Sequence, residues 1–162
     1  MPASMIEIGA VLISLLLVWA AWKDIRHRIL PNSAAVAILI VALGSTALSE
    51  GFGALLPNIA HFAAALLAGI VLFAIRWIGA GDAKVYAALA AAVPVQNGLS
   101  LLAYVAAAMF VTVICWFGFS RIRRARQSSA APSGDFAKVP LGLAIAIGGI
   151  AFLWRTGLHE IL

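Results

Sequence analysis

Gly79-Ala80-Gly81-Asp82-Ala83-Lys84 interrupts a largely apolar stretch that runs from Leu55 to Val95. An aspartate in such a stretch is costly, because membrane insertion is disfavoured by roughly 2.5–3.5 kcal/mol for an aspartate at the centre of a spanning helix. Asp82 is therefore a candidate functional residue. A second aspartate, Asp24, follows the first apolar segment of the chain.

The composition indicates a polytopic membrane protein. Hydrophobic residues make up 64% of the 162 residues and charged residues 10%, whereas charged residues are about a quarter of an ordinary soluble domain. No polar stretch is long enough to build a second core, so we expect one membrane domain over residues 1–162, with a flexible cytoplasmic loop at about 120–138. The single cysteine, Cys115, excludes a disulfide framework and a Cys-based zinc site.

Turn residues and charges divide the chain into apolar segments of a length that favours membrane-spanning helices. We expect an all-α fold with six of them, and the fourth is notably short. The predicted spans are Met5–Trp22, Ser33–Leu48, Leu55–Ile78, Asp82–Val95, Leu99–Phe119 and Val139–Trp154.

The basic residues predict the orientation in the membrane, because cytoplasmic loops carry an excess of Lys and Arg. Ten of the eleven fall in alternate breaks: three within residues 23–28, two flanking the Gly-x-Gly-Asp segment, and five within residues 121–138. We therefore expect these breaks to be cytoplasmic and both termini to face outward. This placement also argues against nucleic-acid binding, because the basic residues do not alternate with aromatic residues on one polar face.

In this topology Asp24 and Asp82 both lie at the cytoplasmic face, at similar depth. Two neighbouring carboxylates cannot both ionise cheaply, so the pKa of one is raised and the pair titrates in two steps. The charged carboxylate can then take a proton from water while the neutral one polarises a peptide carbonyl, as in aspartic proteases. This chemistry needs no metal or cofactor. Gly79 and Gly81 would allow another backbone to approach closely.

Each aspartate also has a simpler interpretation. Asp82 could be the N-cap of the fourth helix, and Asp24 could be a membrane-edge acid paired with Lys23 or Arg28. The combination of the two segments is more specific than either segment alone.

The two segments together resemble those of the type IV prepilin peptidases. Lys23-Asp24-Ile25-Arg26 and the following Leu30-Pro31-Asn32 are similar to that family's first catalytic segment, Asp-x-Arg followed by Ile-Pro-Asn. Gly79–Lys84 is similar to its second segment, Gly-x-Gly-Asp-x-Lys, and Pro140-Leu141-Gly142 is similar to its C-terminal Pro-x-Gly.

The resemblance implies an aspartic peptidase of the bacterial inner membrane that removes the leader from prepilin or pseudopilin precursors. It makes Asp24 and Asp82 the catalytic pair, with Gly79, Gly81, Lys84 and Arg26 in support or substrate contact. The paired Cys-x-x-Cys motifs of the larger bifunctional members are absent, so we expect the short form associated with Flp or tight-adherence pili, without N-methylation. The sequence leaves the oligomeric state open.

Two other functions could also use acids in a small membrane protein. A small transporter or assembly factor could use the acids to carry protons or hold helices together, but no acid lies in the middle of a predicted helix to connect the two sides. A lipoprotein signal peptidase would be of similar size, but its acids lie toward the outer face. The predicted topology favours the prepilin-type peptidase over both.

Overall fold

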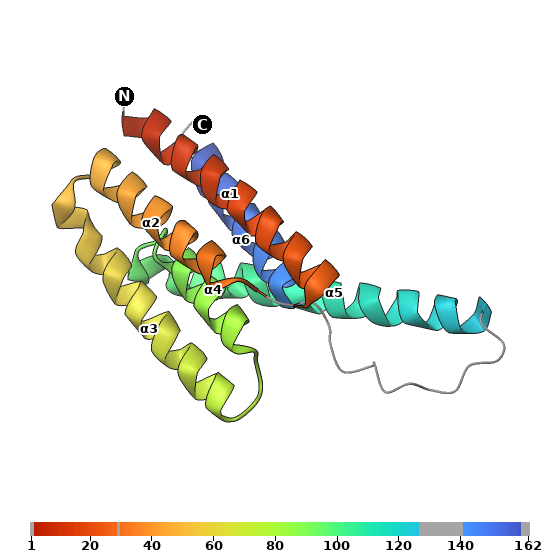
Figure 1. Cartoon of the computed structure of the whole chain (residues 1–162). Helices are drawn as coiled ribbons and strands as arrows, with labels where there is room; N and C mark the ends of the chain where they lie inside the picture. The colour runs from red at the N-terminus through yellow and green to blue at the C-terminus, as the bar shows by residue number, and fades with distance from the viewer. Residues whose placement is uncertain (1, 29, 127–140, 160–162) are drawn as a thin grey trace.

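The computed structural model describes residues 2–28, 30–126 and 141–159, and all the regular elements in these ranges are helical (Figure 1). The predicted all-α fold is therefore confirmed. The helices are α1 (Pro2–His27), α2 (Asn32–Ser49), η1 (Phe52–Ala54), α3 (Leu55–Ala74), α4 (Ala80–Ala90), η2 (Val95–Asn97), α5 (Gly98–Arg126) and α6 (Leu141–His159).

Four stretches are long and apolar enough to cross a membrane: Met5–His27, Asn32–Ser49, Phe52–Ala74 and Val95–Gly118. The other two predicted spans, Asp82–Val95 and Val139–Trp154, are not among these long apolar stretches. The apolar part of α6 that the structure describes covers Leu141–Arg155. The eleven residues of α4 rise only about 16 Å at 1.5 Å per residue, against a hydrocarbon core of about 30 Å.

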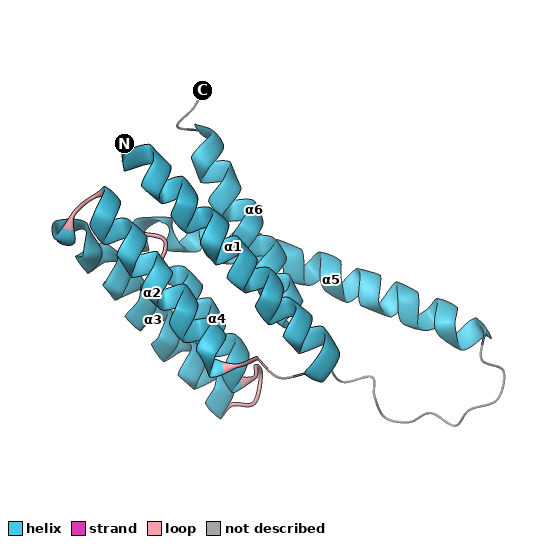
Figure 2. Cartoon of the chain, turned by 45° about the horizontal axis from the view of Figure 1, so that its top comes forward, coloured by secondary structure: helices cyan, strands magenta, loops and turns pink. Residues whose placement is uncertain are grey.

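α4 lies inside the bundle, packed against α2, α3 and α6 (Figure 1 and Figure 2). Six of its residues are buried, and four of these are alanines. A helix that is apolar on every side is stable where other helices surround it, and small side chains let those helices approach closely. The neighbours of α4 therefore fix the position of the Gly-x-Gly-Asp segment at its start.

Polar side chains of α3 explain why α4 ends at Ala90 and not at the predicted Val95. The Asn58 amide donates a hydrogen bond to the Ala91 carbonyl at 3.0 Å, and His61 Nδ1 lies 2.8 Å from the Val93 carbonyl. These contacts satisfy carbonyls that a continued helix would have bonded internally. His61 thereby joins α3 to the segment that follows α4.

A left-handed residue ends α3 before the predicted Ile78. Arg76 has φ 63, and the N–H of Trp77 donates to the Leu72 carbonyl at 2.9 Å. This is the pattern of a Schellman cap, in which a residue with positive φ closes the last turn of a helix. The cap turns the chain back toward the start of α4.

The end of α1 and the start of α6 lie together at the Asp24 end of the bundle. The two helices pack side by side, and the end of α1 contacts the start of α6 through a hydrogen bond described below. They are therefore antiparallel, so α1 begins and α6 ends at the other end of the bundle (Figure 1). α5 is longer than predicted and continues to Arg126; the rest of the predicted cytoplasmic loop, residues 127–138, lies outside the described residues.

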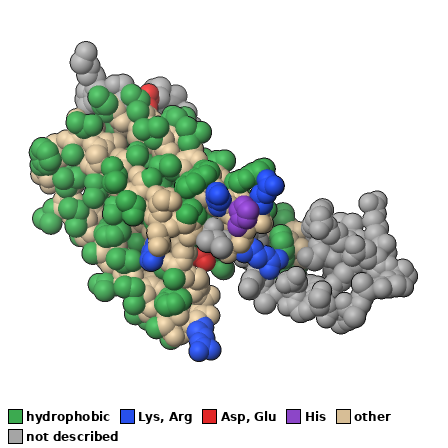
Figure 3. All heavy atoms as spheres, in the orientation of Figure 1, with side chains coloured by type: hydrophobic (Ala, Val, Ile, Leu, Met, Phe, Trp, Pro, Cys, Tyr) green, Lys and Arg blue, Asp and Glu red, His purple; other side chains and the backbone are tan. Residues whose placement is uncertain are grey.

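The surface of the helical bundle is strongly apolar. Large hydrophobic side chains such as Leu15, Leu67 and Phe110 are 62%, 65% and 68% exposed, and Figure 3 shows such side chains over most of one face. On the same face, Lys, Arg and His side chains gather near the end of α1 (Figure 3). An apolar belt with basic residues at one end is typical of a bundle that lies in a membrane.

Candidate active site

Asp24 lies in the last turn of α1 and is partly buried. The helix ends at His27 because Arg28 adopts a left-handed conformation, with φ 54, and donates its N–H to the Asp24 carbonyl at 2.8 Å. The sequence-based placement of Asp24 at the end of the first helix is therefore confirmed. The sharp turn after it directs the following segment toward α4.

Asp82 lies in the first turn of α4, but it is not the N-cap. The helix begins at Ala80 with Gly79 as its N-cap. The interpretation of Asp82 as the N-cap is therefore wrong, because Asp82 lies three residues after it. The Asp82 carboxylate reaches back and accepts backbone hydrogen bonds from Gly79 and from its own N–H, much as an acid three residues after the N-cap does in a capping box. A Cβ on Gly79 would lie 2.7 Å from Asp82 Oδ2, so only glycine leaves room for this conformation.

The start of α6 contacts Asp24 directly. The N–H of Gly142 donates a hydrogen bond to Asp24 Oδ2 at 3.0 Å across 118 positions of the chain. The first N–H groups of a helix have no partner within it, and they favour a negative charge nearby. A Cβ on Gly142 would lie 2.8 Å from the same oxygen, so a glycine is needed for this close approach. Pro140, in the same predicted segment, lies outside the described residues.

The Leu30 side chain lies between the segments that carry Asp82 and Gly142. A Cβ on Gly81 would lie 2.8 Å from Leu30 Cβ, and a Cβ on Gly142 would lie 3.1 Å from Leu30 Cδ2. The partly buried Leu30 side chain thus packs between the start of α4 and the start of α6. The glycines of the two segments let both helix starts reach this one side chain, which brings the two aspartates to the same place.

The electrostatics of Asp82 agree with this geometry. Its helix, α4, is outside the four membrane-spanning stretches. The pKa of Asp82 is raised from 3.8 to about 6, first because burial disfavours the charged carboxylate and second because the negative charge of Asp24 repels it. The backbone hydrogen bonds from Gly79 and Asp82 oppose this rise. The two carboxylates therefore interact, and a shared proton is more stable on Asp82 than on an ordinary aspartate.

Lys84 and Arg26 do not contact the carboxylates among the described interactions. Lys84 Nζ donates a hydrogen bond to Asn32 Oδ1 at 3.1 Å, which ties the Gly-x-Gly-Asp-x-Lys segment to the start of α2. The Arg26 side chain is exposed. The positive charge of Arg28 acts on Asp24, as the simpler interpretation of that residue anticipated.

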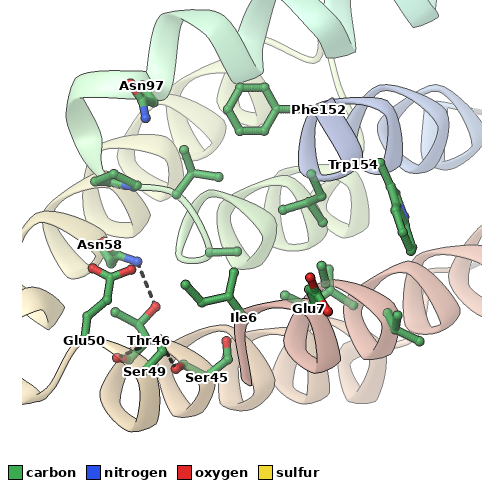
Figure 4. A pocket seen from close by; sticks show the side chains of 17 residues that line it. Ile6, Glu7, Ser45, Thr46, Ser49, Glu50, Asn58, Asn97, Phe152 and Trp154 are labelled. Atoms are coloured by element: carbon green, nitrogen blue, oxygen red, sulfur yellow. Dashed lines mark hydrogen bonds between the residues drawn. The ribbon is translucent and has the colours of Figure 1, made fainter. Parts of the chain in front are cut away.

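A cavity lies at the end of the bundle opposite the two aspartates. It has a volume of about 450 Å³ and is lined by residues such as Glu7, Ser45, Glu50 and Trp154 (Figure 4). Glu7 and Asp24 are in the same helix, and at 1.5 Å per residue they are separated by about 25 Å. Neither aspartate lines this cavity. No three His, Cys, Asp or Glu side chains gather into a possible metal site within the described ranges.

Three contacts were missed by reasoning from the sequence. The site also depends on the Gly142 N–H, the Leu30 side chain and the Asn32 amide oxygen. The candidates predicted from the sequence were Asp24, Asp82, Gly79, Gly81, Lys84 and Arg26. The Pro-Leu-Gly run was a usable signal for Gly142, because glycine at the start of a helix often marks a close contact. The Leu30-Pro31-Asn32 run was a usable signal for Leu30 and Asn32, but it does not say which side chains they contact.

Comparison with known proteins identifies a family. The model of the type IV leader peptidase family matches residues 11–117, a range that contains Asp24 and Asp82 but ends before Gly142. No curated protein and no solved structure matches the chain.

Proposed function

Because the chain belongs to the type IV leader peptidase family, we propose that it is a membrane aspartic endopeptidase that removes the leader from prepilin or pseudopilin precursors. Asp24 and Asp82 are its catalytic pair. One observation carries this proposal: the start of α4, the start of α6 and the Asp24 carboxylate meet around Leu30, close enough for the charge of Asp24 to act on Asp82.

The surroundings of the two carboxylates suggest different roles in peptide hydrolysis. Asp24 accepts the N–H of Gly142 at the start of α6, an arrangement that stabilises its charged form. Asp82 holds a proton more readily because it is buried and lies near the charge of Asp24. Asp24 is therefore the base that takes a proton from the attacking water, and Asp82 is the acid that donates a proton to the carbonyl oxygen of the scissile bond.

The distribution of basic residues supports an active site on the cytoplasmic face of the bacterial inner membrane, with the lipid bilayer around the bundle. A pilin-like precursor has a basic leader followed by an apolar helix. At the membrane edge, the leader stays in water and the apolar helix stays in lipid. In this proposal the activity is cleavage of the leader, as in the short Flp or tight-adherence type, without N-methylation.

The supporting residues have separate tasks in this proposal. Gly79 leaves room for the Asp82 carboxylate and Gly81 leaves room for Leu30. Lys84 holds the start of α2 through Asn32. Arg26, which is exposed at the end of α1, is available to contact the substrate.

The proposal is tested by reconstituting the protein in liposomes and following leader removal from a purified pilin precursor. Asp24→Asn and Asp82→Asn should each lower the rate by about 10²–10⁴-fold or more, since each removes one acid–base group. Glu7→Gln, at the other end of α1, is the matched control and should retain the wild-type rate. Full processing by either aspartate variant would contradict the proposal. It would instead favour a transporter or assembly factor, whose loss leaves leader processing intact.

A further inference from the structure

The cavity at the end of the bundle opposite the two aspartates takes no part in the proposed peptidase chemistry (Figure 4). Its wall is made by α1, α2, α3, η2 and α6. Its volume of about 450 Å³ lies within the range of about 300–1,000 Å³ that is usual for small-molecule pockets. Apolar side chains such as Ile13 and Phe152 form part of the lining, and polar side chains form the rest. The cavity therefore suits a small molecule with an apolar body and a polar group.

The α2 side of the cavity presents hydroxyl groups whose hydrogens are already in use. Ser45 and Thr46 each donate to the Ala42 carbonyl, at 3.0 and 3.1 Å. Ser49 donates to the Ser45 carbonyl at 2.7 Å. A hydroxyl has one hydrogen to donate and two lone pairs that accept. At these residues, what remains for a ligand is therefore hydrogen-bond acceptors.

Asn58 adds an acceptor from α3. The residue is only 4% exposed, and its amide nitrogen donates to Thr46 Oγ1 at 3.1 Å and to the Ala91 carbonyl at 3.0 Å. Its Oδ1 accepts no hydrogen bond among the described residues, although every fully buried side-chain oxygen and nitrogen in them has a partner. This oxygen is therefore open to the cavity that Asn58 lines. An open acceptor on a buried residue needs a donor from a ligand or from water.

The charges on the wall of the cavity have one sign. Glu7 of α1 and Glu50 at the end of α2 line it, and none of its described lining residues is Lys, Arg or His. Ionised carboxylates only accept hydrogen bonds. The indole N–H of Trp154, which also lines the cavity, donates to Ser14 Oγ at 3.3 Å, and the face of an indole ring attracts cations. The wall therefore favours a positively charged donor and disfavours an anion.

We propose that this cavity binds an organic ammonium group that is carried on an apolar body. The three N–H donors of a primary ammonium match the acceptors of the wall, which are the carboxylates of Glu7 and Glu50 and the side-chain oxygens of Ser49 and Asn58. Its apolar body packs against the apolar part of the lining. A free amine and the ethanolamine head group of a phospholipid both carry this chemistry. The site is separate from the acid–base pair, and its occupancy does not depend on the proposed peptidase activity.

The test measures binding to the purified protein by calorimetry in a non-ionic detergent. The probes are 2-phenylethylammonium, the neutral 2-phenylethanol and the anionic 3-phenylpropanoate, which share one apolar body. The ammonium should bind at one site about tenfold or more tightly than the alcohol, since hydrogen bonds to charged groups are the stronger ones, and the anion should bind least. The double variant Glu7→Gln, Glu50→Gln should remove this preference and keep the affinity for the alcohol. Ser49→Ala should weaken binding of the ammonium about threefold, as expected for one neutral hydrogen bond, whereas Ser33→Ala, in the same helix but outside the lining, should not.

A second measurement distinguishes the two sources of the ammonium group. The protein is placed in nanodiscs of equal parts phosphatidylethanolamine and phosphatidylglycerol, and the lipids that it retains are identified by native mass spectrometry. Phosphatidylethanolamine that is retained by the wild type and lost from the double variant supports a lipid head group as the ligand; binding of the ammonium probe without this retention supports a free amine. The proposal is overturned if the alcohol or the anion binds as tightly as the ammonium, or if no probe binds and the cavity holds only water. It is also overturned if the double variant keeps the preference, or if Ser49→Ala and Ser33→Ala have equal effects.

Discussion

Replacing Gly142 by alanine perturbs the proposed catalytic pair without altering any ionisable group. The new Cβ would lie 2.8 Å from Asp24 Oδ2 and 3.1 Å from Leu30 Cδ2, distances at which atoms must move. Because the Gly142 N–H donates to the same oxygen at 3.0 Å, the carboxylate can move away from the methyl group only by lengthening or bending this hydrogen bond.

The size of the effect follows from this displacement. To reach ordinary van der Waals distance from a Cβ placed at 2.8 Å, the oxygen must retreat by roughly half an ångström or more. A misplacement of about 1 Å at a reacting group can cost 10²-fold in rate, and a hydrogen bond to a charged group contributes about 1.5–3 kcal/mol. We therefore expect Gly142→Ala to lower kcat/KM by about 10- to 100-fold while the protein stays folded.

The assay is leader removal in liposomes, with the folded fraction measured by thermal unfolding in detergent. Gly44→Ala is the matched control, because a Cβ at this helical glycine has open space around it. This control should keep the wild-type rate and be slightly more stable, since alanine favours a helix over glycine. Wild-type processing by Gly142→Ala, or a loss explained by its folded fraction alone, would refute the role assigned to the start of α6.

Three further predictions concern the packing of Leu30, the protonation of Asp82 and the hydrogen bond of Asn58. Gly81→Ala should lower activity because its Cβ would lie 2.8 Å from Leu30 Cβ, and Leu30→Gly in the same chain, which removes that Cβ, should restore part of it; a double variant no better than the single one would contradict the packing of Leu30 between the helices. The pH profile of kcat/KM should decline as pH rises through the raised pKa of Asp82, because the proton donor is then lost; a rate still at its maximum at about pH 9 would contradict the role of Asp82 as acid. Asn58→Leu leaves the Ala91 carbonyl without its donor and should destabilise the fold by about 1–3 kcal/mol, measured by denaturation, with normal kcat per folded molecule; a loss of kcat alone would show that α4 is positioned differently.

Each aspartate lies beside a glycine whose absent side chain leaves room for it. Gly79 makes space for the carboxylate of Asp82, and Gly142 makes space for that of Asp24. Both carboxylates also accept backbone N–H groups at the start of a helix, α4 for Asp82 and α6 for Asp24. Because these donors belong to the backbone, they hold the carboxylates in place without introducing a second charged side chain.

The sequence by itself predicted the all-α fold, the order of the helices and the two candidate aspartates. Long apolar segments must form helices in a membrane, because every backbone polar group has to be satisfied internally. An aspartate is retained beside such segments only at a cost, which singles out Asp24 and Asp82. Local turn chemistry, such as the glycines before Asp82, marked where the site would form.

Only the tertiary structure decided how the site is assembled and where the helices end. The Gly142–Asp24 hydrogen bond joins residues 118 positions apart, and the length of α4 depends on Asn58 and His61 reaching across from α3. Such contacts arise from the packing of helix against helix, whereas hydropathy and charge report only the preference of each segment for its surroundings. The partner of each carboxylate is therefore a property of the bundle as a whole.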